Sequence, residues 1–107
     1  MKVPFKTNLT GKTAIVTGGS GTLCSAMAYG LAVSGAKIAL IGRRLDKLQE
    51  VTGDIKVKAE REYGKKVIVK GYSCDVTDKI GLAQVYEIIK RELGSCDILV
   101  NGAGGNQ

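Results

Sequence analysis

A cluster of glycines between an apolar strand and a helix is the feature that most constrains the fold of this chain. Residues Thr13 to Thr17 suit a buried β-strand, and Gly18-Gly19-Ser20-Gly21-Thr22-Leu23-Cys24 follows them. Glycine accepts positive φ and lets backbone N–H groups come close to a ligand, and the free N–H groups of a helix N-terminus attract anions. The turn therefore predicts a pyrophosphate site, with a plain structural turn as the alternative.

Strand-like and helix-like segments alternate along the chain and predict a βαβαβαβ order. Strands are expected at Thr13–Thr17, Lys37–Ile41, Lys66–Tyr72 and Asp97–Asn101. A first helix is expected at Leu23–Ser34, with Gly35 as its left-handed C-terminal residue. A second helix, weakened in its middle by Gly53 and Asp54, carries at helical spacing Leu45, Leu48, Thr52, Ile55 and Ala59. A third has Asp78 as its N-cap and Gly94 at its end, and its apolar stripe consists of Leu82, Val85, Ile89 and Leu93.

Apolar strands joined by helical crossovers indicate a parallel sheet covered on both faces. Right-handed crossovers and a glycine-rich first turn favour an α/β fold of the Rossmann type, a doubly wound parallel sheet in the order 3-2-1-4 that stops after the fourth strand. A flavodoxin-like strand order is the alternative. The 107 residues form a single domain.

Three motifs of the chain resemble those of the short-chain dehydrogenase/reductase family. The chain has Thr17-Gly18-x-x-x-Thr22-x-Cys24, then Cys74-Asp75-Val76-Thr77, then Asp97-Ile98-Leu99-Val100-Asn101-Gly102-Ala103-Gly104. The family patterns are T-G-x-x-x-G-x-G, D-V-T and N-N-A-G, and the resemblance spans about residues 9 to 107. It implies that residues 1–107 are one NAD(P)-binding Rossmann half-domain of an oxidoreductase that moves hydride between cofactor and a carbonyl or alcohol.

The start G-G-x-G-x-L-C and the end N-G-A-G-G-N look like the mannonate and fructuronate oxidoreductase subgroup, which implies a sugar-acid substrate. Three residues depart from the family pattern: Thr22 and Cys24 stand in place of glycines, and Gly102 stands in place of the second Asn of N-N-A-G. The Thr22 hydroxyl could donate to a phosphate oxygen. We interpret Cys24 as a packing residue and not as a reactive thiol.

The turn and the resemblance together predict the cofactor-binding residues. The pyrophosphate turn contributes Gly18, Ser20, Gly21, Thr22 and Leu23. The second strand is followed by Arg43 and Arg44, the adenine pocket is bordered by Asp75 and Val76, and the turn after the fourth strand consists of Asn101, Gly102, Ala103 and Gly104.

The residues after the second strand predict NADP as the cofactor, with NAD as the less favoured choice. An NAD enzyme places a carboxylate at the end of this strand, where it binds the ribose hydroxyls. This chain has Gly42 there, and the guanidinium groups of Arg43 and Arg44 suit a 2′-phosphate. Two arginines on a solvated turn are the alternative.

The net charge and the cysteine content indicate which kinds of partner and bound group the chain could have. The net charge is +6, with basic residues concentrated between Lys56 and Lys70. This basic stretch is explained better by a solvated helix face, or by attraction of the anionic cofactor, than by binding to nucleic acid, since the sequence has no nucleic-acid recognition motif. No apolar run is long enough for a membrane, so a cytoplasmic location is expected. Three scattered cysteines and no histidine argue against a disulfide framework and a metal site.

The family's catalytic Ser, Tyr and Lys lie beyond the N-N-A-G strand, and we assign no residue of this chain to their roles. The chain alone is therefore expected to be inactive. A non-catalytic nucleotide-binding module, a truncated gene product and a fragment complemented by a second polypeptide remain alternatives. The apolar fourth strand lacks the charges and prolines that protect edge strands, which predicts self-association.

Overall fold

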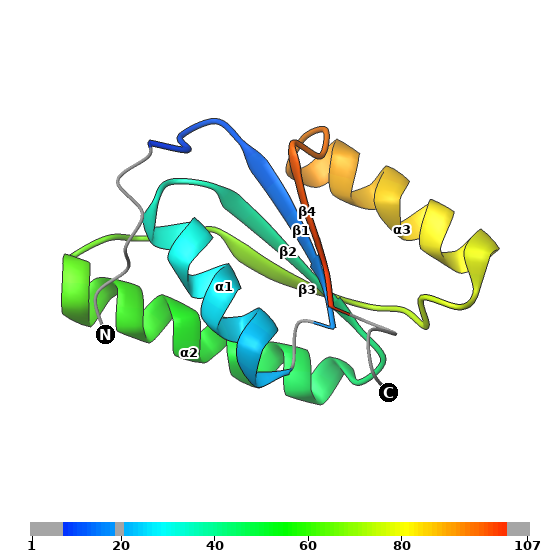
Figure 1. The fold of residues 1–107 in the computed structure, drawn as a ribbon, viewed down its shortest axis with the longest axis horizontal. Coiled ribbons are helices and arrows are strands. Elements are labelled where there is room, and N and C mark those ends of the chain that lie inside the picture. The colour runs from blue at the N-terminus through cyan, green and yellow to red at the C-terminus, as the bar shows by residue number, and fades with distance from the viewer. Residues whose placement is uncertain (1–7, 19–20, 103–107) are drawn as a thin grey trace.

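The computed structural model describes residues 8–18 and 21–102, which form a four-stranded parallel sheet with helices on both faces (Figure 1). The strands are β1 (Thr13–Thr17), β2 (Lys37–Gly42), β3 (Val69–Ser73) and β4 (Ile98–Asn101). The helices are α1 (Thr22–Val33), α2 (Leu45–Tyr63) and α3 (Lys79–Glu92). The sheet order β3-β2-β1-β4, parallel throughout, confirms the predicted Rossmann-type order of the four strands.

Helices cover the two faces of the sheet unequally. Figure 1 shows α1 and α2 on one face and α3 alone on the other. Alternate side chains of a strand point to opposite faces, so Val16 packs toward α1 and α2 while its neighbour Ile15 packs toward α3. All five residues of β1 are buried. Strand β1 is therefore buried over its whole length, with three apolar residues between Thr13 and Thr17.

The helix ends follow the residues that the sequence suggested. The Asp78 carboxylate accepts a hydrogen bond from Gly81 N (3.1 Å), which confirms it as the N-cap of α3. Gly35 has φ +111°, and a Cβ there would lie 2.9 Å from Thr10 N, so this position needs glycine. The third helix packs its predicted stripe on the sheet.

The element bounds differ from the prediction in small ways. Helix α2 runs unbroken through Gly53, whose missing Cβ would face open space, and Leu45 at its start is exposed. Strand β3 begins at Val69 and not at Lys66, and its first pair with β2 is Val69 with Ile38.

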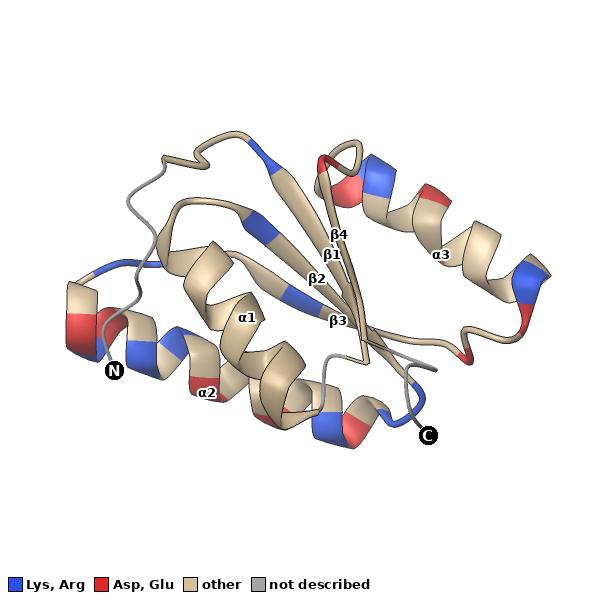
Figure 2. Cartoon of the chain, in the orientation of Figure 1, with Lys and Arg blue, Asp and Glu red and all other residues tan. Residues whose placement is uncertain are grey.

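Charged residues lie mainly on α2, α3 and the loops (Figure 2). Acidic and basic side chains alternate along α2, whereas α1 carries neither. Lys65 Nζ donates to the carbonyl of Val33 (2.8 Å), and Lys70 pairs with Glu92 (3.0 Å). The basic stretch is thus interleaved with acids and partly engaged within the chain.

Candidate cofactor site

The carboxyl ends of the four parallel strands meet at one edge of the sheet. Asn101 is the last residue of β4, and the other described candidate residues lie in the loops and helix starts that follow the strands. Ligands of doubly wound sheets bind in the crevice at this edge. Ser20, Ala103 and Gly104 fall outside the described residues.

The turn after β1 leaves backbone donors free at the start of α1. Gly18 has φ +75°, and its N–H donates to the carbonyl of Ile41 (2.8 Å). Gly21 is the N-cap residue and has no side chain with which to cap the helix. Among the described residues, the N–H groups of Thr22, Leu23 and Cys24 have no hydrogen-bond acceptor. The lack of a described acceptor for these first-turn N–H groups and the helix dipole give this end of α1 the character of an anion site.

The loop after β2 brings Arg43 beside Asp75 from the loop after β3. Their closest nitrogen and oxygen atoms are 3.7 Å apart, and both side chains remain exposed to solvent. Hydrogen bonds from the hydroxyl and the N–H of Thr77 lower the pKa of Asp75, and the nearby Arg43 charge lowers it further. Arg43 and Asp75 therefore lie side by side at the carboxyl edge of the sheet, and their roles in cofactor binding stay predictions.

Arg44 points elsewhere. Its guanidinium donates to Asp46 (2.9 Å), and this hydrogen bond is the main cause of the lowered pKa of Asp46. The pair lies at the start of α2, where a carboxylate also interacts favourably with the helix dipole. Of the two candidate arginines, Arg43 is the one that faces the β3 loop.

Gly42, at the end of β2, adjoins the buried side chain of Leu48 on α2. A Cβ added at Gly42 would lie 3.2 Å from Leu48 Cδ2, and one added at Gly71 on β3 would lie 3.0 Å from Leu48 Cβ. Leu48 is fully buried. Because neither glycine has a Cβ, the Leu48 side chain fits between α2 and the sheet.

Hydrogen bonds of Thr17 join the end of β1 to the end of β4. The Thr17 hydroxyl donates to Asn101 Oδ1 (2.8 Å), and the Gly102 N–H donates to the Thr17 carbonyl (3.0 Å). Sequence reasoning did not single out the Thr17 side chain. Val76 packs partly buried on the α3 side of the sheet, so part of its surface belongs to the core.

Helix α3 contains a Tyr-x-x-x-Lys spacing, Tyr86 and Lys90, which the expectation of no proton donor overlooked. Tyr86 packs partly buried against the α3 side of the core, near Ile89, and Lys90 is exposed. The spacing follows from the helical repeat, and Tyr86 serves packing. Neither residue follows a strand end, so the structure gives no reason to assign them a catalytic role.

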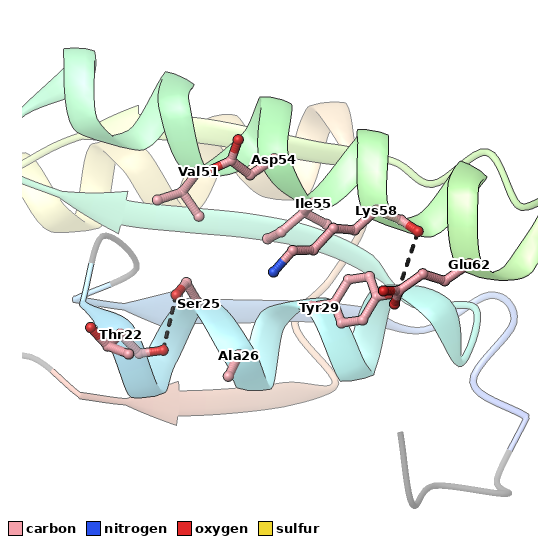
Figure 3. Close-up of a pocket in the computed structure, with 9 residues that line it drawn as sticks. All are labelled: Thr22, Ser25, Ala26, Tyr29, Val51, Asp54, Ile55, Lys58 and Glu62. Atoms are coloured by element: carbon pink, nitrogen blue, oxygen red, sulfur yellow. Dashed lines mark hydrogen bonds between the residues drawn. The ribbon is translucent and has the colours of Figure 1, made fainter. Parts of the chain in front are cut away.

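A groove of about 240 Å³ runs between α1 and α2 (Figure 3). Its one link to the candidate residues is Thr22. Farther along, the Tyr29 hydroxyl donates to Glu62 (2.6 Å) and joins the two helices. Burial, followed by this hydrogen bond, raises the pKa of Tyr29 to about 12.

The chain matches the short chain dehydrogenase family over residues 12–107. It belongs to this family. It is 43% identical over 104 residues to an uncharacterized oxidoreductase, UxuB, of Bacillus subtilis, and this match covers 97% of the chain and 35% of the relative. The chain thus spans about a third of the length of that short-chain dehydrogenase relative.

Solved short-chain dehydrogenases share the fold and carry nicotinamide cofactors. One, provisionally named a D-mannonate oxidoreductase, from Haemophilus influenza with bound NAD, has a TM-score of 0.75 and 34% identity over 94% of this chain and 34% of its own. L-sorbose reductase of Gluconobacter frateurii, complexed with NADPH and L-sorbose, has a TM-score of 0.76 and 34% identity over 94% of this chain and 36% of its own. The predicted family, with its mannonate-type relatives, is confirmed.

No described helix combines the length and apolar character needed to cross a bilayer. Within residues 8–18 and 21–102, no three Cys, Asp or Glu side chains gather as a metal site would require.

Proposed function

We propose that this chain is the dinucleotide-binding part of a short-chain dehydrogenase that uses NADP(H) and acts on a carbonyl or alcohol of the sugar-acid class. The cofactor would supply or accept the hydride. This chain's own residues would bind and orient it: the free N–H groups of α1 would receive the pyrophosphate, and Arg43 the 2′-phosphate.

The position of Arg43 is the observation that carries the choice of cofactor. Of the two solved structures similar to this chain, one contains NAD and the other NADPH, so family membership alone leaves the choice of cofactor open. In this chain no carboxylate stands at Gly42 to repel a phosphate, and an exposed guanidinium follows directly. A charged bidentate contact favours the phosphorylated cofactor. The sugar-acid substrate, the cytoplasmic location and the absence of nucleic-acid or membrane partners stay predictions.

Calorimetric titration tests the proposal. NADP(H) should bind more tightly than NAD(H), and Arg43→Ala should weaken NADP(H) by about 1.5–3 kcal/mol, the usual loss of a charged hydrogen bond. NAD(H) should bind Arg43→Ala almost as it binds the wild type. Arg44→Ala should have a smaller effect, because Arg44 is engaged with Asp46. Arg61→Ala, which removes an exposed arginine in the last turn of α2, is the matched control. Equal losses for both cofactors would overturn the phosphate role of Arg43.

A further inference from the structure

Two of the residues that depart from the family pattern meet in space. Cys24 stands on α1 in place of the last glycine of the first motif, and Gly102 stands after β4 in place of an Asn. A Cβ added at Gly102 would overlap the Sγ atom of Cys24. The volume that a side chain at position 102 would need is therefore filled by the thiol of Cys24.

The backbone of Gly102 does not itself demand glycine. Positive φ angles occur at other described glycines, such as Gly18 and Gly35, and Gly102 is not among them. An L-residue could adopt its backbone conformation. The nearest obstacles are Cys24 Sγ and, at 3.0 Å, the carbonyl oxygen of Thr17. The need for glycine at position 102 thus comes mainly from Cys24.

This contact lies between two parts of the candidate cofactor site. Cys24 is the third residue of α1, whose first N–H groups are the free donors of the pyrophosphate turn. Gly102 is hydrogen-bonded to Thr17 and follows Asn101. How closely the start of α1 approaches the end of β4 depends on the atoms between them, because packed interiors yield little.

We propose that Cys24 and Gly102 are a matched positioning pair that sets the approach of the α1 N-terminus to the end of β4 and so places the cofactor-binding backbone donors. This inference rests on the proposed function. It assigns Cys24 a role in geometry and none in chemistry.

A double-mutant cycle tests the pair, using Gly102→Ala, Cys24→Ala and the variant with both changes. Alanine at position 24 removes Sγ but keeps Cβ, which lies 3.8 Å from the added Cβ at position 102, an ordinary contact. Gly53→Ala is the matched control, because a Cβ there meets nothing within 4 Å. Two readouts are recorded for each variant: the affinity for NADP, and the amide resonances of Gly18 and Gly21 in a ¹⁵N-correlated spectrum.

Gly102→Ala should lower NADP affinity about tenfold or more, as expected where an added methyl overpacks a close contact. It should also shift the Gly18 and Gly21 resonances. Adding Cys24→Ala to Gly102→Ala should restore most of the NADP affinity and most of the wild-type resonance positions. Gly53→Ala should change neither the affinity nor the resonances. The proposal of a matched pair is overturned if Gly102→Ala behaves like Gly53→Ala, or if adding Cys24→Ala to Gly102→Ala restores neither the affinity nor the resonances.

The two readouts separate this inference from the proposed function. A wild-type chain that binds neither nucleotide would contradict the proposed function. The Gly18 and Gly21 resonances would still decide whether the pair positions the turn, since they need no cofactor. If the wild-type chain binds NADP, recovery of the resonances without recovery of the NADP affinity would overturn the positioning role.

Discussion

The guanidinium of Arg43 lies 3.7 Å from the carboxylate of Asp75, so the cation proposed to bind a 2′-phosphate already has an anion beside it. Asp75 belongs to the loop after β3 and is held in place by hydrogen bonds from Thr77. A phosphate arriving at Arg43 would approach this second negative charge. The Asp75 carboxylate beside the arginine would therefore repel the phosphate that Arg43 attracts.

Neutralising Asp75 should increase the preference for the phosphorylated cofactor. In Asp75→Asn the ratio of the Kd for NAD to the Kd for NADP should rise, because a charge that repels phosphate is removed while an oxygen that can accept from Thr77 remains. Since both charges are exposed, the rise should shrink as salt is added. Asp46→Asn, next to Arg44, is the control. An unchanged ratio in titrations of both variants would contradict the opposing role of Asp75.

The 107-residue chain should not reduce carbonyl substrates at a rate comparable to an intact enzyme of the family. General acid–base catalysis contributes about 10²–10⁴-fold, and no tyrosine among the described residues lies in the strand-end loops of the candidate site. NADPH oxidation followed at 340 nm with sugar-acid ketones measures this. Turnover that Tyr86→Phe abolishes would instead make Tyr86 and Lys90 a catalytic pair.

We propose that the chain self-associates through β4. Among the described residues this strand pairs only with β1, and its Leu99 side chain is 54% exposed. Two copies could pair these edges and bury the apolar side chains. Light scattering from micromolar to high micromolar concentration should show association that Leu99→Lys reduces. Val57→Lys, which changes an exposed apolar residue on α2, is the control. A wild-type chain that stays monomeric would refute the proposal.

Alkaline pH should weaken the contact between α1 and α2. Burial and the hydrogen bond to Glu62 raise the pKa of Tyr29 to about 12, against roughly 10 in an unfolded chain. The stability that this shift represents is fully present below the unfolded pKa and is lost as the pH rises through the folded pKa.

Urea unfolding measured at several pH values between 8 and 12 checks this expectation. Tyr29→Phe should lower the free energy of unfolding by about 0.5–1.5 kcal/mol at pH 8, the usual value of one hydrogen bond. Tyr29→Phe should also make the free energy of unfolding fall less steeply as the pH rises. Part of the decline should remain, since burial and Glu92 also raise the pKa of Tyr72. Tyr86→Phe should keep the full decline, and an identical profile for both variants would contradict the role of Tyr29.

Local patterns were sufficient to predict the order of elements and the sheet. Asp78 could be identified as an N-cap because a cap depends on residues three positions apart. Partners distant in sequence could not be predicted in the same way. The link from Thr17 to Asn101 and the meeting of Cys24 with Gly102 depend on how β4 is placed beside β1. The sequence likewise placed Arg43 and Arg44 together, whereas their carboxylate partners turn them toward different neighbours.

Leu48, seated above Gly42 and Gly71, constrains how the cofactor preference of this chain could change over evolution. An ancestor or descendant with a carboxylate at position 42 needs room for a Cβ that in this chain would lie 3.2 Å from a fully buried leucine. A Cβ at position 42 would require the end of the Leu48 side chain to move by a few tenths of an ångström. The freedom of that one side chain therefore sets how readily a carboxylate could replace Gly42.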